Sequence, residues 1–137
     1  MHVEPYLFFE GRCSEALEFY RNALGAEVTA LIRYKDSPEP PQPGTLPPGS
    51  ENKVLHASFR VGETTVLCSD GRCSGKPSFQ GYSLAIVTSS DAEATRLFNA
   101  LSEGGQVHQA LIKTFFSSSF GMLADRFGVG WMFTVAA

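Results

Sequence analysis

Three side chains that can bind a polar ligand alternate along one short segment, at His56, Ser58 and Arg60. Because successive side chains of a β-strand point to opposite faces, these three are expected to share one face, and residues 55, 57 and 59 the core face. Imidazole, with an ordinary pKa of about 6.5, acts as acid, base or hydrogen-bond donor, and guanidinium suits an anionic group. This row indicates a small-molecule pocket with His56 as its leading residue; on an outer face the same row would simply be solvated.

Cysteine chemistry is a second possibility. Cys68 is expected to face the hollow of the sheet that would form this pocket. As a nucleophile, Cys68 would need a base such as His56 nearby. The alternative is a small buried apolar residue, as free cysteines often are. The three cysteines cannot all pair, and the spacing from Cys68 to Cys73 is not that of a redox or zinc motif, so we expect reduced thiols.

The segments that must position these residues occur twice. Residues 12–24 recur as residues 91–101, each copy following an apolar strand-like run and leading to glycine and a new strand. The periodicities predict strands at 3–9, 28–34, 53–61 and 64–69 around a helix at 12–24, then strands at 81–87, 106–112, 121–124 and 129–135 around a helix at 91–102. A duplicated module of this kind predicts a ligand site in the seam between its copies.

We therefore predict an α+β fold of two βαβββ modules, forming curved mixed sheets with the helices on their convex sides. The modules make up a single domain over residues 1–137, with module one at about 1–70, a linker at 71–79 and module two at about 80–137. Residues 36–52 hold six of the eight prolines and are expected to form a surface loop.

Alternation also assigns faces to the remaining candidates. Pro5, Leu7 and Phe9 are expected to form an apolar floor of the hollow, and Ser83 is expected to face it from the second module. Met132 is expected to face it too, while residues 131 and 133 pack against the helix. The phenylalanines at 115, 116 and 120 form either an aromatic lid or part of the core.

Composition excludes several classes of partner. The formal net charge is −3 and no stripe of Lys and Arg is present, so we do not expect the protein to bind nucleic acid. No apolar run approaches the roughly 20 residues that span a bilayer, so we do not expect the protein to be inserted in a membrane. The N-terminal residues lack the pattern of a signal peptide, and a cytoplasmic location is expected.

Four motifs along the chain together carry a family resemblance. They are Tyr6-Leu7-Phe8-Phe9-x-Gly11, Ala16-Leu17-x-Phe19-Tyr20, Lys53-Val54-x-His56-Ala57, and Phe120-Gly121-Met122 through Asp125-x-Phe127-Gly128-Val129-x-Trp131-Met132. These motifs resemble the PhnB-like family of the vicinal oxygen chelate superfamily, which includes glyoxalase I, extradiol dioxygenases, and fosfomycin- and bleomycin-resistance proteins. The resemblance implies paired βαβββ modules and a homodimer with a cavity on each U-shaped sheet. The name demethylubiquinone methyltransferase, which such proteins often carry, has no support here, because no Gly-x-Gly nucleotide loop follows a strand.

Catalytic members of the superfamily hold a divalent metal at four strand positions, which the resemblance assigns to Pro5, Val66, Ser83 and Met132. These residues cannot supply the His, Glu or Gln donors that such a metal needs. No two of the three histidines, at 2, 56 and 108, share a ligand spacing. We therefore expect no cofactor and disfavour a divalent metal.

Three functions follow from this. The leading hypothesis is a metal-independent small-molecule-binding protein, dimeric, with a pocket rimmed by His56, Ser58 and Arg60. The second is a lyase, isomerase or dioxygenase that uses a displaced metal or acid–base chemistry at His56. The third is a bleomycin-type protein that sequesters an antibiotic. The sequence leaves open the ligand, the pathway and whether any substrate is turned over.

Overall fold

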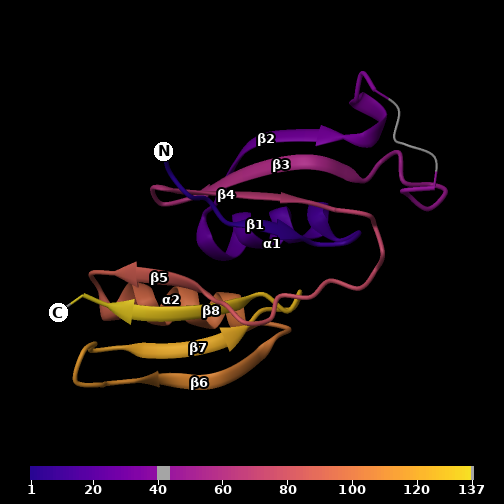
Figure 1. Ribbon diagram of the computed structural model, residues 1–137. Coiled ribbons are helices and arrows are strands. Elements are labelled where there is room, and N and C mark those ends of the chain that lie inside the picture. Colours follow the sequence, from indigo (N-terminus) through magenta and orange to yellow (C-terminus); the bar gives the residue numbers. More distant parts are fainter. Residues whose placement is uncertain (40–43, 137) are drawn as a thin grey trace. The chain divides into compact units, whose positions relative to one another are not determined.

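The computed structural model describes residues 1–39 and 44–136, and the chain divides into two compact units, 1–78 and 79–137. Each unit holds a four-stranded mixed sheet with one α-helix packed on its convex side (Figure 1). The order βαβββ occurs twice, so the predicted α+β fold of two such modules is confirmed.

The first unit contains β1 (Tyr6–Phe8), α1 (Cys13–Leu24), β2 (Glu27–Arg33), the 3-10 helix η1 (Tyr34–Asp36), β3 (Val54–Val61) and β4 (Thr64–Ser69). The strand order is β1-β4-β3-β2. Strand β1 runs parallel to β4, and the β3 pairings are antiparallel. This order places β1 and β2 at the two edges and β3 in the interior.

Helix α1 forms because its apolar residues recur at helical spacing, so that one face can be buried. The buried residues are Cys13, Ala16, Leu17, Tyr20 and Ala23. The helix ends at Gly25, whose left-handed φ of 66° allows its N–H to bond the carbonyl of Arg21. The Tyr20 ring stacks on Phe59 of β3 with 5.3 Å between the ring centroids, which fixes the helix on the sheet.

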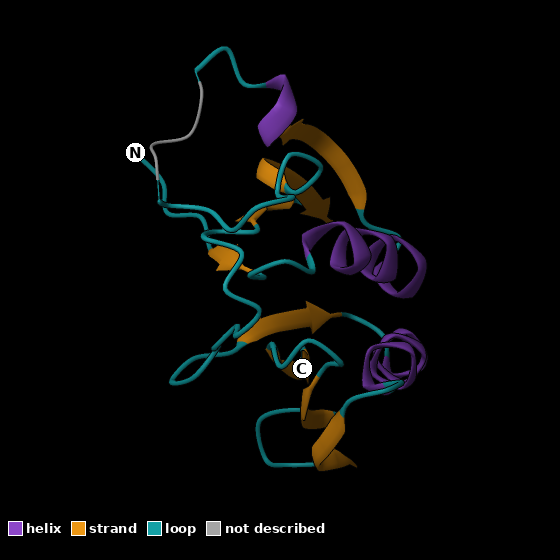
Figure 2. Ribbon diagram, turned by 90° about the vertical axis from the view of Figure 1, so that its right-hand side faces the viewer, coloured by secondary structure: helices purple, strands orange, loops and turns teal. Residues whose placement is uncertain are grey.

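The second unit contains β5 (Leu84–Thr88), α2 (Asp91–Ser102), β6 (Gln106–Ile112), β7 (Phe120–Ala124) and β8 (Gly130–Val135), in the strand order β5-β8-β7-β6 (Figure 1). Figure 2 shows that the helix of each unit lies on one side of its strands. Helix α2 and strand β6 have the predicted bounds. Ser90 caps the helix, because its hydroxyl accepts the N–H of Glu93 at 3.2 Å.

The core of the second unit lies between its sheet and α2. Trp131 and Phe133 are 2% and 0% exposed, and Phe133 meets Phe98 of α2 edge to face at 5.5 Å. The prediction that these two residues pack against the helix is confirmed. Gly121 is required here, because a Cβ would lie 2.8 Å from side-chain atoms of Leu111 and Phe98.

Two buried aspartates hold the irregular segments in place. The side-chain oxygens of both aspartates accept several N–H groups. Asp70 Oδ1 accepts the N–H groups of Gly11 at 3.0 Å and Cys13 at 2.7 Å, and Oδ2 accepts that of Val54 at 2.7 Å. This carboxylate therefore joins the start of α1 to the start of β3.

Asp125 does the same in the turn between β7 and β8. Its Oδ1 accepts the N–H groups of Phe127 and Val129, and its Oδ2 accepts the indole N–H of Trp131 at 2.8 Å. Both aspartates are therefore buried carboxylates that organise the backbone.

Outside the regular elements, residues 40–43 of the predicted surface loop 36–52 lie outside the described part of the chain. The predicted linker 71–79 contains the boundary between the two units, after Ser78. None of the helices in residues 1–39 and 44–136 is long and apolar enough to cross a membrane.

Candidate functional site

The candidate site lies on the face of the first sheet that is turned away from α1. Residues directly opposite each other on neighbouring strands point to the same face. His56 is opposite Ile32 of β2, and Ser58 is opposite Leu67 of β4. Leu67 is in turn opposite Tyr6 of β1. The open face therefore combines residues from all four strands: Tyr6, Phe8, Ile32, His56, Ser58, Arg60 and Leu67.

The site's central feature is a hydrogen bond between Tyr6 and His56. The phenol oxygen lies 3.0 Å from Nδ1, and the two ring centroids are 5.7 Å apart. Either the phenol donates to a neutral Nδ1, or a protonated Nδ1 donates to the phenol oxygen. Phe8 extends this group, with its centroid 4.8 Å from that of Tyr6.

This hydrogen bond orients the imidazole for a ligand. It occupies Nδ1, whereas Nε2 of His56 has no hydrogen-bond partner among residues 1–39 and 44–136. A polar group placed against the face can therefore meet Nε2 as a donor or an acceptor, depending on the tautomer. Tyr6 and Phe8, 36% and 52% exposed, offer aromatic surface beside it.

Ser58 and Arg60 share the face with His56, as predicted, and each has a protein partner. The Ser58 hydroxyl lies 2.7 Å from the hydroxyl of Thr29, and Ser58 is only 8% exposed. Arg60 forms an exposed ion pair with Glu27 at 2.6 Å. An exposed ion pair of this kind is weak and exchanges easily, so Arg60 is available to an anionic ligand group.

Cys68, Leu7 and Phe9 lie on the other face, and their predicted orientation toward the hollow is wrong. Cys68 is fully buried, with its sulfur 3.6 Å from that of Cys13 at the start of α1. Leu7 is opposite Cys68 and is 1% exposed. Phe9 packs on Tyr20 of α1, with ring centroids 6.1 Å apart. A nucleophilic Cys68 activated by His56 is excluded, because the sheet separates the two side chains.

Sequence reasoning missed Tyr6 and Phe8. Apolar residues fill both parities of this short strand, so alternation alone could not choose which set faced the helix. The cross-strand register was the missing information, since it places Leu7 beside the buried Cys68. Pro5, half-buried, precedes β1, and its carbonyl accepts the N–H of Leu67 at 2.9 Å.

The second sheet presents a more apolar open face. Met132 is opposite Ala85 of β5 and Met122 of β7, and all three point away from the side that carries Trp131 and Phe133. Ser83 is exposed just before β5, and a Cβ at Gly130 would lie 2.9 Å from its hydroxyl. Met132 thus faces as predicted, whereas Ser83 precedes the paired residues of its strand.

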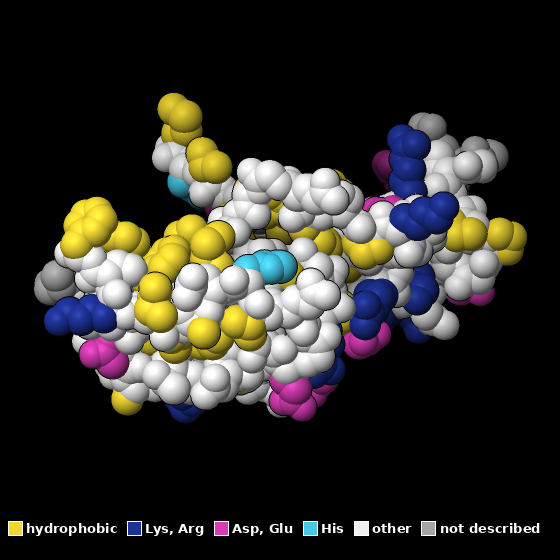
Figure 3. All heavy atoms as spheres, turned by 90° about the horizontal axis from the view of Figure 1, so that it is seen from below, with side chains coloured by type: hydrophobic (Ala, Val, Ile, Leu, Met, Phe, Trp, Pro, Cys, Tyr) yellow, Lys and Arg dark blue, Asp and Glu magenta, His cyan; other side chains and the backbone are white. Residues whose placement is uncertain are grey.

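Exposed apolar residues continue along the edge of the second unit. Phe115 is fully exposed and Phe116 is 48% exposed, so the core alternative for this pair is wrong. Val107 and Ile112 of β6 are also exposed. Figure 3 turns this side of the second unit toward the viewer and shows hydrophobic side chains gathered on it, with a histidine among them.

The positions that the resemblance assigns to a metal do not fit a divalent cation. Val66 is 3% exposed and lies opposite Phe59, on the helix side of its sheet. Pro5 and Met132 offer no hard donor, and Ser83 offers only a hydroxyl. In the part of the chain that the structure describes, no three His, Cys, Asp or Glu side chains gather into a group that could hold a metal ion.

Comparison with known proteins places the chain in a family. Residues 1–134 match the model of the family described as 3-demethylubiquinone-9 3-methyltransferase. The chain belongs to this family. A curated relative, protein YjdN of Escherichia coli strain K12, is 34% identical over 140 residues, which covers 98% of this chain and 95% of YjdN.

Two solved structures of similar length support the assignment. Protein PA1353 from Pseudomonas aeruginosa is 39% identical, with a TM-score of 0.84 over 99% of this chain and 98% of that one. A PhnB protein from Bacillus cereus, called a putative 3-demethylubiquinone-9 3-methyltransferase, is 28% identical, with a TM-score of 0.80 over 99% of this chain and all of that one. The family is therefore PhnB-like.

A more distant structure shares the fold alone. The fosfomycin resistance protein FosX from Listeria monocytogenes is 9% identical, with a TM-score of 0.66 over 100% of this chain and 93% of that one. The two βαβββ units of this chain thus have the glyoxalase- and bleomycin-resistance-like fold.

Proposed function

We propose that this protein binds a small organic molecule on the open face of its first sheet, without a metal ion. The observation that carries the proposal is the Tyr6–His56 hydrogen bond, which leaves Nε2 of His56 for a ligand beside exposed aromatic surface. Apolar surface next to a few oriented polar groups is the usual composition of a small-molecule site. The poor fit of the assigned metal positions supports binding without a metal.

The same residues suggest the ligand's chemistry. Its flat or apolar part would pack on Tyr6 and Phe8, and a hydrogen-bonding group would meet His56. An anionic substituent would reach Arg60 and displace the Glu27 carboxylate that is 2.6 Å away.

Two further elements complete the proposal. The protein acts as a homodimer, as the family resemblance implies, and it works in the cytoplasm. Strand β6 is an edge strand on which Val107 and Ile112 are exposed, which is typical of surfaces that another chain covers. Light scattering at several protein concentrations tests the dimer, and a monomer at every concentration would contradict it.

A lyase, isomerase or dioxygenase of the superfamily, either metal-dependent or acid–base, is the second candidate function. The Tyr6–His56 pair favours an acid–base lyase or isomerase, because a phenol hydrogen-bonded to an imidazole provides two groups that exchange protons. A protein that sequesters an antibiotic of the bleomycin type would use the same face without turnover. Methyl transfer is not proposed, because the described units are antiparallel-rich βαβββ sheets and carry no glycine-rich nucleotide loop after a strand.

The decisive experiment is a search for a bound small molecule. Native mass spectrometry of the purified protein and a thermal-shift screen of metabolites and antibiotics would find ligands. His56→Ala should abolish the shift, whereas His108→Ala, an exposed histidine of β6 in the other unit, should leave it unchanged. Equal shifts in both variants would remove His56 from the site.

Elemental analysis of the purified protein distinguishes binding without a metal from the metal-dependent alternative. We expect less than stoichiometric Ni, Mn, Fe or Zn, and no gain of ligand affinity when these ions are added. One tightly bound ion per chain would overturn the metal-free proposal. Product formation from a ligand that the screen identifies, lost in His56→Ala, would establish the acid–base enzyme.

A further inference from the structure

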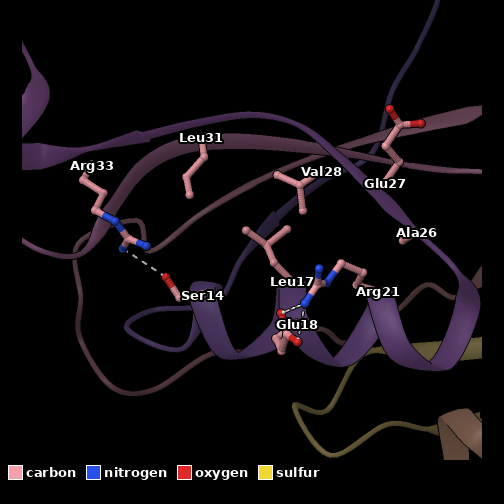
Figure 4. A pocket seen from close by; sticks show the side chains of 9 residues that line it. All are labelled: Ser14, Leu17, Glu18, Arg21, Ala26, Glu27, Val28, Leu31 and Arg33. Carbon is pink, nitrogen blue, oxygen red and sulfur yellow. Dashed lines mark hydrogen bonds and ion pairs between the residues drawn. The ribbon is translucent and has the colours of Figure 1, made fainter.

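A groove lies on the helix side of the first sheet, where α1 passes beside the edge strand β2 (Figure 4). Its volume is about 590 Å³, within the range of small-molecule sites. The sheet separates it from the face that carries His56. The lining residues come from α1 and from the chain around β2: Ser14, Leu17, Glu18, Arg21, Ala26, Glu27, Val28, Leu31 and Arg33.

The middle of the groove is apolar. Leu31 and Val28 of β2 are 43% and 36% exposed, although they lie opposite the buried Ala57 and Phe59 of β3. Leu17 of α1 projects between them in the close view (Figure 4). Strand β2 is an edge strand, so no further strand covers this surface within the unit.

One end of the groove is cationic. Arg33 donates from Nη1 to the Ser14 hydroxyl at 3.1 Å and to the carbonyl of Asn52 at 2.6 Å, both neutral acceptors. Within residues 1–39 and 44–136, no carboxylate forms an ion pair with Arg33.

The other end is charge-balanced. Arg21 pairs with Glu18 at 2.6 Å, and Glu27 pairs with Arg60 at 2.6 Å. The excess positive charge is therefore concentrated beside Arg33 and Ser14, next to Leu31 (Figure 4).

We propose that this groove binds an amphipathic carboxylate with an unbranched apolar chain. The carboxylate accepts hydrogen bonds from the Arg33 guanidinium and the Ser14 hydroxyl, and the chain lies over Leu31, Leu17 and Val28. From Arg33 to Val28 the strand extends roughly 16 Å, which suits a medium-length acyl chain. A guanidinium–carboxylate pair supplies orientation, and the apolar surface supplies most of the affinity. This site goes beyond the proposed function and does not depend on it.

A titration of the protein with decanoate, monitored by calorimetry and by backbone amide NMR, tests the proposal. We expect saturable binding, with shifts confined to α1 and β2. Arg33→Gln should weaken it about tenfold, the loss of one charge-assisted interaction. Arg96→Gln, an exposed arginine of α2, is the matched control and should bind as the native protein does. Decanol, which lacks the charge, should bind native protein and Arg33→Gln equally weakly.

Leu31→Ser tests the apolar part, and its exposure makes the substitution compatible with folding. It should weaken decanoate and decanol alike. Absence of saturable decanoate binding would overturn the proposal, as would equal affinity in Arg33→Gln and Arg96→Gln. Shifts centred on Tyr6 and His56 would also overturn it, by placing the ligand on the opposite face. If a second copy covers the groove, the protein will dimerise through β2, decanoate will not bind, and the proposal fails.

Discussion

The Tyr6 hydroxyl meets Nδ1 of His56 at 3.0 Å although their strands are not neighbours, because β4 lies between β1 and β3. The two side chains therefore reach diagonally across β4, where Leu67 is opposite Tyr6 on one side and opposite Ser58, two residues from His56, on the other. Edge strand β1 thus contributes directly to the orientation of a histidine on the interior strand.

Replacing Tyr6 with Phe should free the imidazole without destabilising the fold. The pair is exposed, so the free energy of unfolding should change by less than about 0.5 kcal/mol in urea denaturation. The ¹⁵N chemical shift of Nδ1 should change, because the hydrogen bond that favours one tautomer is lost. Phe8→Leu, beside the pair, should leave that shift unchanged, and an unchanged shift in Tyr6→Phe would refute the hydrogen bond.

The fold was predictable because its signals are local and repeated. Helix α2 has its predicted bounds, since Ser90 caps it and its buried residues recur at helical spacing. The Gly25 termination of α1 and the tight turn at Gly62 between β3 and β4 depend on single residues that permit a positive φ. Such features are encoded within a few neighbouring residues.

The faces of the strands were less predictable because they depend on long-range register. On β3, polar and apolar residues alternate, and His56, Ser58 and Arg60 share a face as expected. On β1, both faces are apolar, so Leu7 and Phe9 were assigned to the wrong side. The role of Asp70 in joining the start of α1 to the start of β3 could not be predicted from the sequence either, because its hydrogen-bond partners lie 16 to 59 residues away along the chain.

Removing the Asp70 carboxylate should strongly destabilise the protein. Asp70→Ala leaves three backbone N–H groups without their acceptor, at Gly11, Cys13 and Val54. The expected loss is about 3 kcal/mol in denaturant unfolding, because hydrogen bonds to a charged group are strong and buried donors are costly to leave unpaired. Asp36→Ala, an exposed acidic residue of η1, should change stability by less than about 0.5 kcal/mol. Similar losses of unfolding free energy in the two variants would contradict this role of the Asp70 carboxylate.

The three thiols should react in a fixed order. Cys13 and Cys68 are fully buried, and the hydrogen bond with Cys68 together with burial raises the pKa of the Cys13 thiol. Cys73 is half-buried, and burial raises its pKa from the ordinary 9.0. Because the thiolate is the reactive form, a thiol reagent at pH 8 should modify Cys73 slowly and leave the other two intact until denaturant is added. The Cys73→Ala variant should then show no reaction with the reagent in the folded state. Rapid modification of two thiols in the native protein would contradict the buried contact between Cys13 and Cys68.

The segment that carries Phe115 and Phe116 should loosen in acid. Asp91 Oδ1 accepts the hydroxyls of Ser118 at 2.6 Å and Ser119 at 2.7 Å, and these bonds hold its pKa below the ordinary 3.8. A lowered pKa means that the stabilisation is complete above pH 3.8 and is lost as the pH falls through the still lower folded-state value.

Amide NMR of residues 113–119 between pH 6 and pH 2 measures this change. The amide signals should stay constant down to pH 4 and then shift together, while those of β8 remain native-like. The double variant Ser118→Ala, Ser119→Ala should show loosened signals already at pH 6 and no further change in acid, because its Asp91 carboxylate has lost both donors. A native segment that titrates above pH 4, or a double variant that retains the acid transition, would show that another group anchors the two phenylalanines.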